Sequence, residues 1–438
     1  MPLETKNKVV CPGCSLLCDD IAVDVQFNKV VKVHNACLRG SRKINFSTNK
    51  SRLKKALVKP EGTSNFTEMI YDDALKTSVD LIKKSKHVVI SGINHLCNDA
   101  QALAFQLASK INARISITDN QLYDDLNGAI SRNGLEFFTL GEVINNSDLI
   151  LFWGANPIDR MPKLVVKTIF SRGRYRQTGK EVKKFAVIDG YPSPTMERAD
   201  IKIVSPCLDQ VLVLKVLVRG LIENNTLEKT AIDEFGYKKE ELEVLEIPDT
   251  MQETIKDLLN ALKYVEYTTI FIGEGMLNTQ FLRENKVFLD KLLIFVKELN
   301  KHSRVAMTPL FYPYNYKGAA EELKTIDPFL EMVNLNQAIE AGEEVDLIVS
   351  IGSDFVSRLG STTFEKIKDL PIISLDFKES PTTRQSRIVL PVKLTGIESS
   401  GIVTRFDGSL LKFNPVVRID DGLRSDREIL EYFLEHLE

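Results

Sequence analysis

Residues 148–157 read Asp-Leu-Ile-Leu-Phe-Trp-Gly-Ala-Asn-Pro: five consecutive apolar residues, followed at once by a glycine turn. Strands buried on both faces by helices lose the alternation of polar and apolar residues, so a short uniformly apolar run predicts a strand inside a parallel sheet. Asp148 and Gly154 bound the run closely, which makes it far too short to cross a membrane. The stretch therefore predicts a strand that ends in a tight turn.

The same pattern recurs along most of the chain. Helical periodicity over 71–84 and 97–110 separates further apolar runs, and a hairpin is expected at 21–33 around Asn28 and Lys29. Alternating helices and short apolar strands predict α/β domains with doubly wound parallel sheets. The predicted strands are 88–92, 114–118, 149–153, 185–189, 201–204, 268–272, 347–351 and 372–376.

Several predicted strands end in glycine or in an acid. In open parallel sheets ligands bind beyond the carboxyl ends of the strands, where glycine admits a phosphate and an acid can hold a ribose or a base. One such turn has little weight, because glycine after a strand is usually only loop geometry, but five of them suggest a large dinucleotide-like ligand. The candidate cofactor-binding residues are Asn156, Asp189, Gly352, Ser353 and Asp376.

Four of the six cysteines occur in the first 37 residues, as Cys11-Pro-Gly-Cys14, Cys18 and Cys37. Sulfur ligands at this density suit zinc or an iron–sulfur cluster. A zinc site commonly uses two similar Cys-x2-Cys pairs, and the second pair is missing here. We therefore expect a [4Fe-4S] cluster on Cys11, Cys14, Cys18 and Cys37, with zinc and disulfides as alternatives.

The overall composition excludes several classes of protein. Of 438 residues, 43% are hydrophobic and 27% charged, which is ordinary for a globular chain with a substantial core. Lys plus Arg (57) nearly balances Asp plus Glu (60), so no excess positive charge favours nucleic acid. No apolar run approaches the ~20 residues of a membrane span. We expect a cytoplasmic protein, with Cys97 and Cys207 as packing residues.

Taken in order, the motifs resemble the catalytic B-type subunit of formylmethanofuran dehydrogenase, within the molybdopterin (DMSO reductase-like) oxidoreductases. The resemblance rests on Cys11-Pro-Gly-Cys-x3-Cys-Asp-Asp20, Thr139-Leu-Gly-Glu-Val143, residues 148–157, and Gly396-Ile-Glu-Ser-Ser-Gly401 with the segment after it to Gly408. It covers essentially the whole chain.

The resemblance implies a fold and a set of cofactors. It implies an N-terminal [4Fe-4S] domain over 1–57, a discontinuous α/β domain over 58–115 and 263–438, and an inserted α/β domain over 116–262. It also implies that the C-terminal β-barrel domain of larger relatives is missing. Two pterin guanine dinucleotides with tungsten or molybdenum are implied besides the cluster, and Arg39 would lie between cluster and pterin. Amidohydrolase-type A, C and D subunits are the implied partners.

The residues that would do the chemistry in this family are replaced. A Cys-His segment is expected about 17 residues before Thr139, where this chain has Leu122 and Tyr123. An arginine is expected two residues after Asp189, where this chain has Tyr191. A basic run is expected after Pro157, where this chain has Met161-Pro-Lys-Leu164. Leucine offers no lone pair to a metal, and tyrosine is a poor proton relay at neutral pH.

Three hypotheses follow for the function. The first is a scaffold and electron-transfer subunit that keeps its [4Fe-4S] cluster but has a degenerate CO2/formate site. The second is an active tungsten- or molybdenum-pterin oxidoreductase that interconverts CO2 and formate or formylmethanofuran with an altered site. The third is an interaction protein stabilised by zinc. Because the metal-ligand and catalytic positions are replaced, the sequence leaves open whether the chain is an enzyme.

Overall fold

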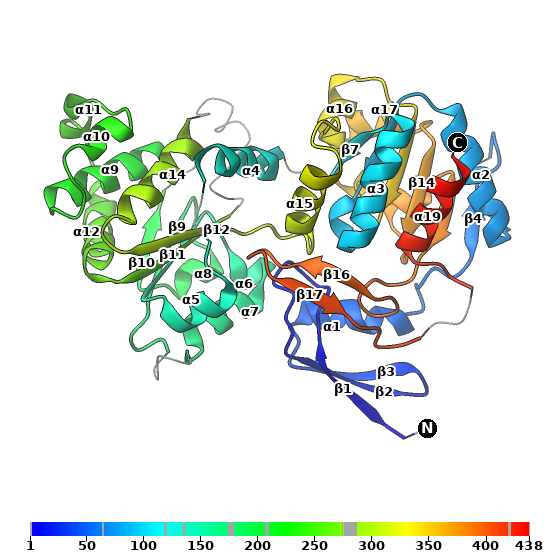
Figure 1. The fold of residues 1–438 in the computed structure, drawn as a ribbon, viewed down its shortest axis with the longest axis horizontal. Coiled ribbons are helices and arrows are strands. Elements are labelled where there is room, and N and C mark those ends of the chain that lie inside the picture. The colour runs from blue at the N-terminus through cyan, green and yellow to red at the C-terminus, as the bar shows by residue number, and fades with distance from the viewer. Residues whose placement is uncertain are drawn as a thin grey trace. The chain divides into compact units, whose positions relative to one another are not determined.

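The structure is a computed structural model that describes residues 2–63, 65–117, 121–134, 137–173, 179–205, 210–273, 275, 287–418 and 422–437. It divides into two compact units. Unit 1 comprises residues 1–120 and 313–438, and unit 2 comprises residues 121–312. Figure 1 shows a sheet covered by helices in each unit. None of the described helices combines the length and apolarity that a membrane span requires.

Unit 1 is built on a seven-stranded sheet in the order β5-β4-β15-β14-β13-β6-β7. Five of its strands are parallel: β6 (Val88–Ser91), β7 (Arg114–Ser116), β13 (Leu347–Ile351), β14 (Ile372–Asp376) and β15 (Ile388–Pro391). The antiparallel strands β4 (Ala56–Val58) and β5 (Thr67–Met69) extend one edge. The strand order reverses between β6 and β13, so the sheet is doubly wound and has its switch point there.

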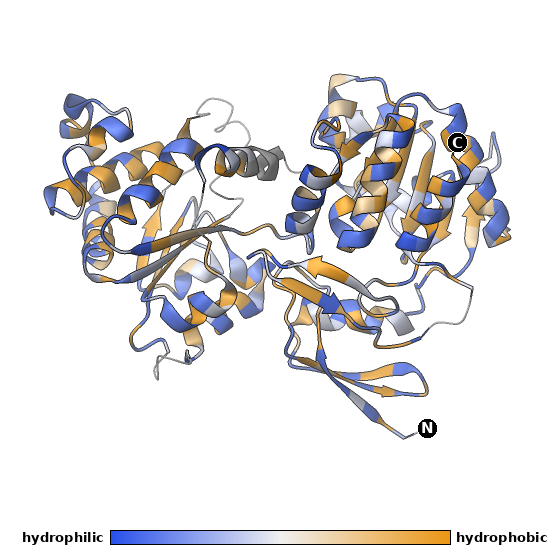
Figure 2. Cartoon of the chain, in the orientation of Figure 1, coloured by the Kyte–Doolittle hydropathy of each residue, from blue (hydrophilic) through white to orange (hydrophobic). Residues whose placement is uncertain are grey.

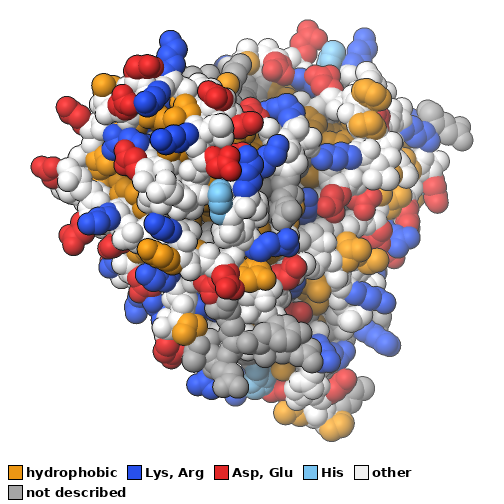
Figure 3. Space-filling model, turned by 60° about the vertical axis from the view of Figure 1, so that its left-hand side comes forward, with side chains coloured by type: hydrophobic (Ala, Val, Ile, Leu, Met, Phe, Trp, Pro, Cys, Tyr) orange, Lys and Arg blue, Asp and Glu red, His pale blue; other side chains and the backbone are white. Residues whose placement is uncertain are grey.

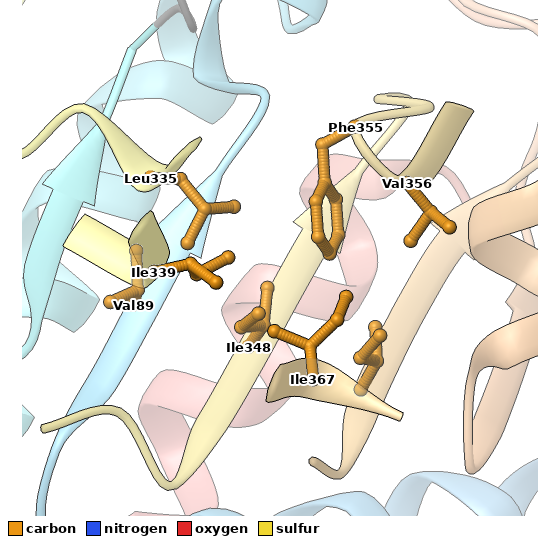
Figure 4. Close-up of a cluster of buried hydrophobic side chains, with 8 residues drawn as sticks. Val89, Leu335, Ile339, Ile348, Phe355, Val356 and Ile367 are labelled. Atoms are coloured by element: carbon orange, nitrogen blue, oxygen red, sulfur yellow. The ribbon is translucent and has the colours of Figure 1, made fainter. Parts of the chain in front are cut away.

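The core of this sheet explains why its strands have no polar face. Val89 of β6, Ile348 of β13 and Ile372 of β14 pack against α16 (Leu335–Ala341), α17 (Ser361–Ile367) and Phe355 (Figure 4). The other helices of unit 1 are α2 (Tyr71–Lys84), α3 (Asn98–Ile111), α15 (Tyr316–Ile326), α18 (Pro381–Gln385) and α19 (Asp426–His436). Figure 2 shows the expected contrast between apolar strands and two-sided helices.

The N-terminal segment belongs to unit 1 and is not a separate domain. It has an antiparallel sheet of β1 (Glu4–Val9), β2 (Ile21–Gln26) and β3 (Lys29–His34), followed by α1 (Leu38–Asn45). The expected hairpin is confirmed, with Phe27 and Asn28 at its turn. A second hairpin of β16 (Gly401–Thr404) and β17 (Leu410–Phe413) also lies in unit 1.

Unit 2 has a five-stranded, fully parallel sheet in the order β10-β9-β8-β11-β12. The strands are β8 (Leu149–Trp153), β9 (Lys184–Asp189), β10 (Ile201–Val204), β11 (Tyr267–Ile272) and β12 (Arg304–Pro309). Its helices are α4 (Gln121–Asn133), α5 (Leu140–Asn146), α6 (Pro157–Arg160), α7 (Pro162–Val165), α8 (Pro194–Glu197), α9 (Gln210–Glu223), α10 (Ala231–Glu234), α11 (Lys239–Glu243), α12 (Asp249–Tyr264) and α14 (Phe288–Leu299), with a π-helical turn at Val166–Phe170.

The expected boundary of the inserted domain at 262 is wrong. β11 pairs in parallel with β8 and β12 pairs with β11, so residues 263–312 complete the sheet of unit 2. A short apolar strand does not indicate which sheet it joins, and the sequence therefore could not place β11. The eight strands predicted from the sequence are all present, and all eight are parallel.

Candidate cofactor site

The cysteine loop follows β1 directly. The Cys11 N–H donates to the Cys18 carbonyl at 2.9 Å and the Leu17 N–H to the Cys14 carbonyl at 3.0 Å, so the loop folds back on itself. Leu17 adopts φ = 42°, a left-handed conformation that costs a bulky residue energy and is tolerated only where the surroundings impose it. This geometry packs Cys11, Cys14 and Cys18 into one buried loop.

Helix α1 brings the fourth cysteine to this loop. Cys37 is the N-cap of α1, and its sulfur accepts a hydrogen bond from the Gly40 N–H at 3.5 Å. A Cβ at Gly40 would lie 2.6 Å from Cys11 Sγ and 3.9 Å from Cys37 Sγ, so both sulfurs approach the same point. Only glycine leaves this space open, which explains its presence in the first turn of a helix.

Backbone donors point at the sulfurs of this loop. Burial raises the pKa of Cys11, the charges of Cys14, Cys18 and Cys37 add to the rise, and a hydrogen bond from the Gly13 backbone opposes it. Burial likewise raises the pKa of Cys14 to about 11. Thiols this close repel as thiolates unless a cation or cluster neutralises them.

None of the five described cysteines forms a disulfide, and no group of three or more His, Cys, Asp or Glu side chains in the described residues has the arrangement for a single metal ion. Cys207 lies outside the described residues. Cys97 is buried as the N-cap of α3, and burial raises the pKa of its thiol well above the ordinary value. Cys97 therefore has the environment of an unreactive packing residue.

The carboxyl edge of the unit 1 sheet positions three of the predicted residues. Gly352 follows β13 with φ = 60°, and a Cβ there would lie 3.2 Å from the Cβ of His95. Ser353 is buried beside it, and Asp376 ends β14 with its side chain also buried. Glycine is needed at 352 both for the left-handed backbone and for the close approach of His95.

Asp376 has an oxygen without a partner. Its Oδ1 accepts hydrogen bonds from the N–H groups of Phe377 at 2.7 Å and Lys378 at 3.3 Å. Its Oδ2 is buried and has no hydrogen-bond partner among the described residues. Burial raises the pKa of Asp376 to about 6, against the opposing charges of Lys378 and Lys43. Buried acceptors are normally satisfied, so this oxygen is suited to a donor on a ligand.

Cations that the sequence did not single out surround this edge. Burial lowers the pKa of His95 to about 3, and the charges of Lys43, Arg358, Lys378 and Arg39 add to the effect. The Lys43 ammonium lies 4.1 Å from the centre of the Phe377 ring, and burial lowers its pKa to about 8. Several positive charges facing one neutral imidazole form a field that favours an anionic ligand.

The sequence did not single out Lys43, because it lies in α1, far in the chain from β13 and β14. Arg358 ends the short helical turn that follows β13, beyond Gly352. Arg39 was predicted from the resemblance. It is exposed on α1, and its charge partly opposes the rise that burial causes in the pKa of Cys14. A usable signal for Lys378 was present, since it follows the acid at the end of β14 by two residues.

The carboxyl edge of the unit 2 sheet holds the remaining predicted residues. Asn156 accepts a hydrogen bond from the Thr195 hydroxyl at 2.6 Å and donates one to Asp159 at 2.5 Å, so its amide braces the turn after β8. Asp189 is buried at the end of β9, where burial raises its pKa while the Gly190 N–H donates to it at 2.7 Å.

The positions with replaced chemistry differ in their exposure to solvent. Met161 is completely buried, whereas 56% of the Tyr191 surface is exposed. Leu122 and Tyr123 fall in the first turn of α4, and their side chains lie outside the described residues. The structure thus brings together the residues of the unit 1 edge, but it does not bring Met161 and Tyr191 to one exposed surface.

Comparison with known proteins identifies the family. The model of the molybdopterin oxidoreductase family matches residues 52–436. The chain belongs to the molybdopterin oxidoreductase family. Two curated relatives are the B-type subunits of tungsten-containing formylmethanofuran dehydrogenase 2 from Methanococcus maripaludis (27% identity, covering 100% of this chain and 99% of the relative) and from Methanocaldococcus jannaschii (25%, 98% and 98%).

Two solved structures share the fold of this family member. The formyltransferase/hydrolase complex of Methylorubrum extorquens, in complex with methylofuran, superposes with a TM-score of 0.61 at 17% identity over 87% of this chain and 98% of that one. Acetylene hydratase of Pelobacter acetylenicus superposes with a TM-score of 0.73 at 12% identity over 99% of this chain and 69% of that one.

Proposed function

We propose that this family member is a protein of C1 metabolism that resembles the B-type subunit of formylmethanofuran dehydrogenase. In this proposal it acts as a scaffold and electron-transfer subunit that holds a [4Fe-4S] cluster on Cys11, Cys14, Cys18 and Cys37. The full-length similarity to two B-type subunits supports the assignment. The observation that carries it is the placement of the four-cysteine set and the cationic edge around Asp376 in one compact unit.

The cysteine loop fits a cluster by the chemistry of its donors. Backbone N–H groups of Gly13, Leu16 and Gly40 donate to the sulfurs of Cys11, Cys14 and Cys37 respectively. Hydrogen bonds of this kind favour thiolates over thiols and tune the potential of bound iron. The cluster would store and pass one electron at a time, while the loop shields it from water.

The unit 1 edge fits a pterin dinucleotide. The unpartnered Oδ2 of Asp376 would accept hydrogen bonds from the guanine or pterin ring, and the left-handed turn at Gly352 lets the backbone approach a phosphate. Lys43, Lys378 and Arg358 would offset the phosphate charge. We propose that the cofactor is a bis-pterin guanine dinucleotide with tungsten or molybdenum. Asn156 and Asp189, at the carboxyl edge of the unit 2 sheet, are proposed separately as cofactor-binding residues of that unit.

The substitutions at Leu122, Tyr123 and Tyr191 support loss of the CO2/formate redox step in this subunit. The retained unit 1 edge favours the second candidate, an active oxidoreductase with an altered site, because a buried carboxylate with one oxygen unpartnered among the described residues is costly to keep without a ligand. The proposed partners are amidohydrolase-type A, C and D subunits of a formylmethanofuran dehydrogenase-like or formyltransferase/hydrolase-like complex. The N-terminal cluster is part of this proposal.

Electron paramagnetic resonance of the anaerobically purified, reduced complex tests the cluster. We expect a reduced-cluster signal in the wild type that disappears in Cys14→Ser and persists in the matched control Cys97→Ala. Loss of the signal in both variants, or its absence from the wild type, would contradict the assignment.

Assays of CO2 reduction separate the two candidates. The scaffold proposal predicts no formate from the wild-type complex and its appearance in the variant Leu122→Cys, Tyr123→His and Tyr191→Arg. Formate formation by the wild type would establish the active oxidoreductase instead.

A further inference from the structure

Two pockets in unit 1 meet at the side chain of Asp426. The first, here the outer pocket, has a volume of about 290 Å³ and is lined by Cys97, Asp99 and Arg427 among others. The second, here the inner cavity, has a volume of about 30 Å³ and is lined by residues that include His95 and Gly352. Asp426 and Lys393 line both. The inner cavity has room for about one water, and the side chains of Lys43, Thr395 and Asp426 in its lining offer that water hydrogen-bond partners.

The outer pocket is open to solvent, whereas Asp426 is not. The side chains of Arg427 and Asp99 at its rim are 54% and 38% exposed. Asp426 is only 6% exposed, at the first position of α19 after the N-cap Ser425. The inner cavity reaches the carboxyl edge of the sheet at Gly352, beside which we propose the cofactor. Asp426 therefore separates solvent from that edge.

Hydrogen bonds continue from Asp426 towards the inner cavity. Its Oδ2 accepts a hydrogen bond from the Thr395 hydroxyl at 3.1 Å, and its Oδ1 accepts from the Arg427 N–H at 3.0 Å. Thr395 and Tyr314 both line the inner cavity, where the Tyr314 phenol donates to the His95 carbonyl. The Thr395 hydroxyl thus lies between the Asp426 carboxylate and the inner cavity that Thr395 lines.

Among the residues that the structure describes, no cation pairs with the Asp426 carboxylate. Arg427 pairs with Asp99 at 3.0 Å and with Glu431 at 2.9 Å, and Lys393 pairs with Glu428 at 3.4 Å. Glu398 is paired with Arg52, and Cys97 and Tyr314 are buried acids that stay neutral. Burial raises the pKa of Asp426 to about 6, and the Asp99 charge adds to the rise. Asp426 can therefore change protonation state near neutral pH.

We propose that Asp426 and Thr395 conduct protons from the outer pocket to the inner cavity. A proton from solvent binds the Asp426 carboxylate. The acid then donates this proton to Thr395 Oγ1 as Thr395 gives its own hydroxyl proton to a water in the inner cavity. Both residues return to their starting protonation, one proton has crossed, and no electrons have moved. The role rests on the proposed function, because the proton would offset the negative charge that reduction adds to unit 1.

Infrared spectroscopy of the purified complex tests whether Asp426 takes up protons from solvent, and this readout does not depend on any cofactor. We expect a carboxylic-acid band that titrates near pH 6, shifts within minutes in D2O, and is missing in Asp426→Asn. A band that does not shift in D2O, or no band assignable to Asp426, would overturn the proposal.

Proton uptake on reduction tests conduction. With a pH-sensitive dye in weak buffer, Asp426→Asn and Thr395→Val should slow uptake at least tenfold. Thr395→Ser, which keeps the hydroxyl, and Glu431→Gln, on the same helix outside both pockets, should match the wild type. Equal rates in all variants would overturn the relay. A complex that contains no iron would refute the proposed function and with it the need for the proton, while the infrared band of Asp426 would still titrate.

Discussion

Asp376 is the residue at which a proposed role in cofactor binding most clearly opposes the stability of the folded chain. Its buried carboxylate has one unpartnered oxygen and a raised pKa of about 6, so ionisation in the folded state costs free energy. The folded protein binds this proton more tightly than the unfolded chain, whose carboxyl titrates near 3.8. The contribution to stability is therefore fully present below pH 3.8 and is lost as pH rises through 6.

Asp376→Asn removes this cost and should stabilise the cofactor-free protein at pH 7.5 by about 1–3 kcal/mol, with little change at pH 4. Urea unfolding at the two pH values measures the difference. Pterin content of the purified complex should fall, because the amide presents a donor where an acceptor is needed. A variant that is no more stable at pH 7.5, or that keeps its pterin, would contradict this account.

Gly40 is the second residue with a specific steric role. Gly40→Ala places a methyl carbon 2.6 Å from Cys11 Sγ, well inside van der Waals contact, so the cysteine loop or α1 must shift. We expect the purified complex to lose most of its iron, as measured by elemental analysis. The control is Gly360→Ala, because a Cβ there meets nothing within 4 Å and its iron content should be unchanged. Full iron in Gly40→Ala would show that the sulfurs do not converge beside α1.

At the scale of elements, one buried ion pair joins the segment after α1 to the segment after β15. Arg52 contacts Glu398 at 2.5 Å, and the side chains are 1% and 0% exposed. Arg52 also donates to the carbonyls of Phe377 at 3.1 Å and Val392 at 2.7 Å, next to the ends of β14 and β15. The pair thus links the cysteine segment to the edge that carries Asp376.

Removing one partner leaves the other charge buried and alone. Arg52→Met should destabilise unit 1 by about 3–5 kcal/mol, and adding Glu398→Leu should recover a large part of that loss. Denaturant unfolding of the single and double variants gives both values. A double variant no more stable than Arg52→Met alone would show that the backbone contacts of Arg52, and not the charge pair, stabilise the junction.

Individual elements were the part of the fold that the sequence could predict. Runs dominated by apolar residues, such as 149–153 and 347–351, predict buried parallel strands whatever their neighbours are. Strand partners depend on contacts between distant segments, so β11 was assigned to the wrong domain. The site shows the same division: Asp376 ends a strand and Gly352 follows one, and both were predicted, whereas Lys43 of α1 reaches that edge only through tertiary packing.

At the scale of the whole molecule, unit 2 is a continuous segment with its own complete sheet and core. Its five parallel strands pair only with one another among the described residues. Charges of both signs are interspersed on the face shown in Figure 3, which is typical of a surface that water can solvate.

Residues 121–312 expressed alone should therefore fold. We expect a cooperative thermal transition by circular dichroism and dispersed amide signals by NMR. A segment that unfolds without cooperativity would mean that unit 2 depends on unit 1 for its stability.

The central claim is that one chain keeps a four-cysteine cluster site and a pterin edge after losing its redox residues. Elemental and pterin analysis of the anaerobically purified complex tests it most directly. The account predicts four irons for each copy of this chain, with pterin guanine dinucleotide present and zinc at background. Zinc in place of iron, or iron without any pterin, would contradict it.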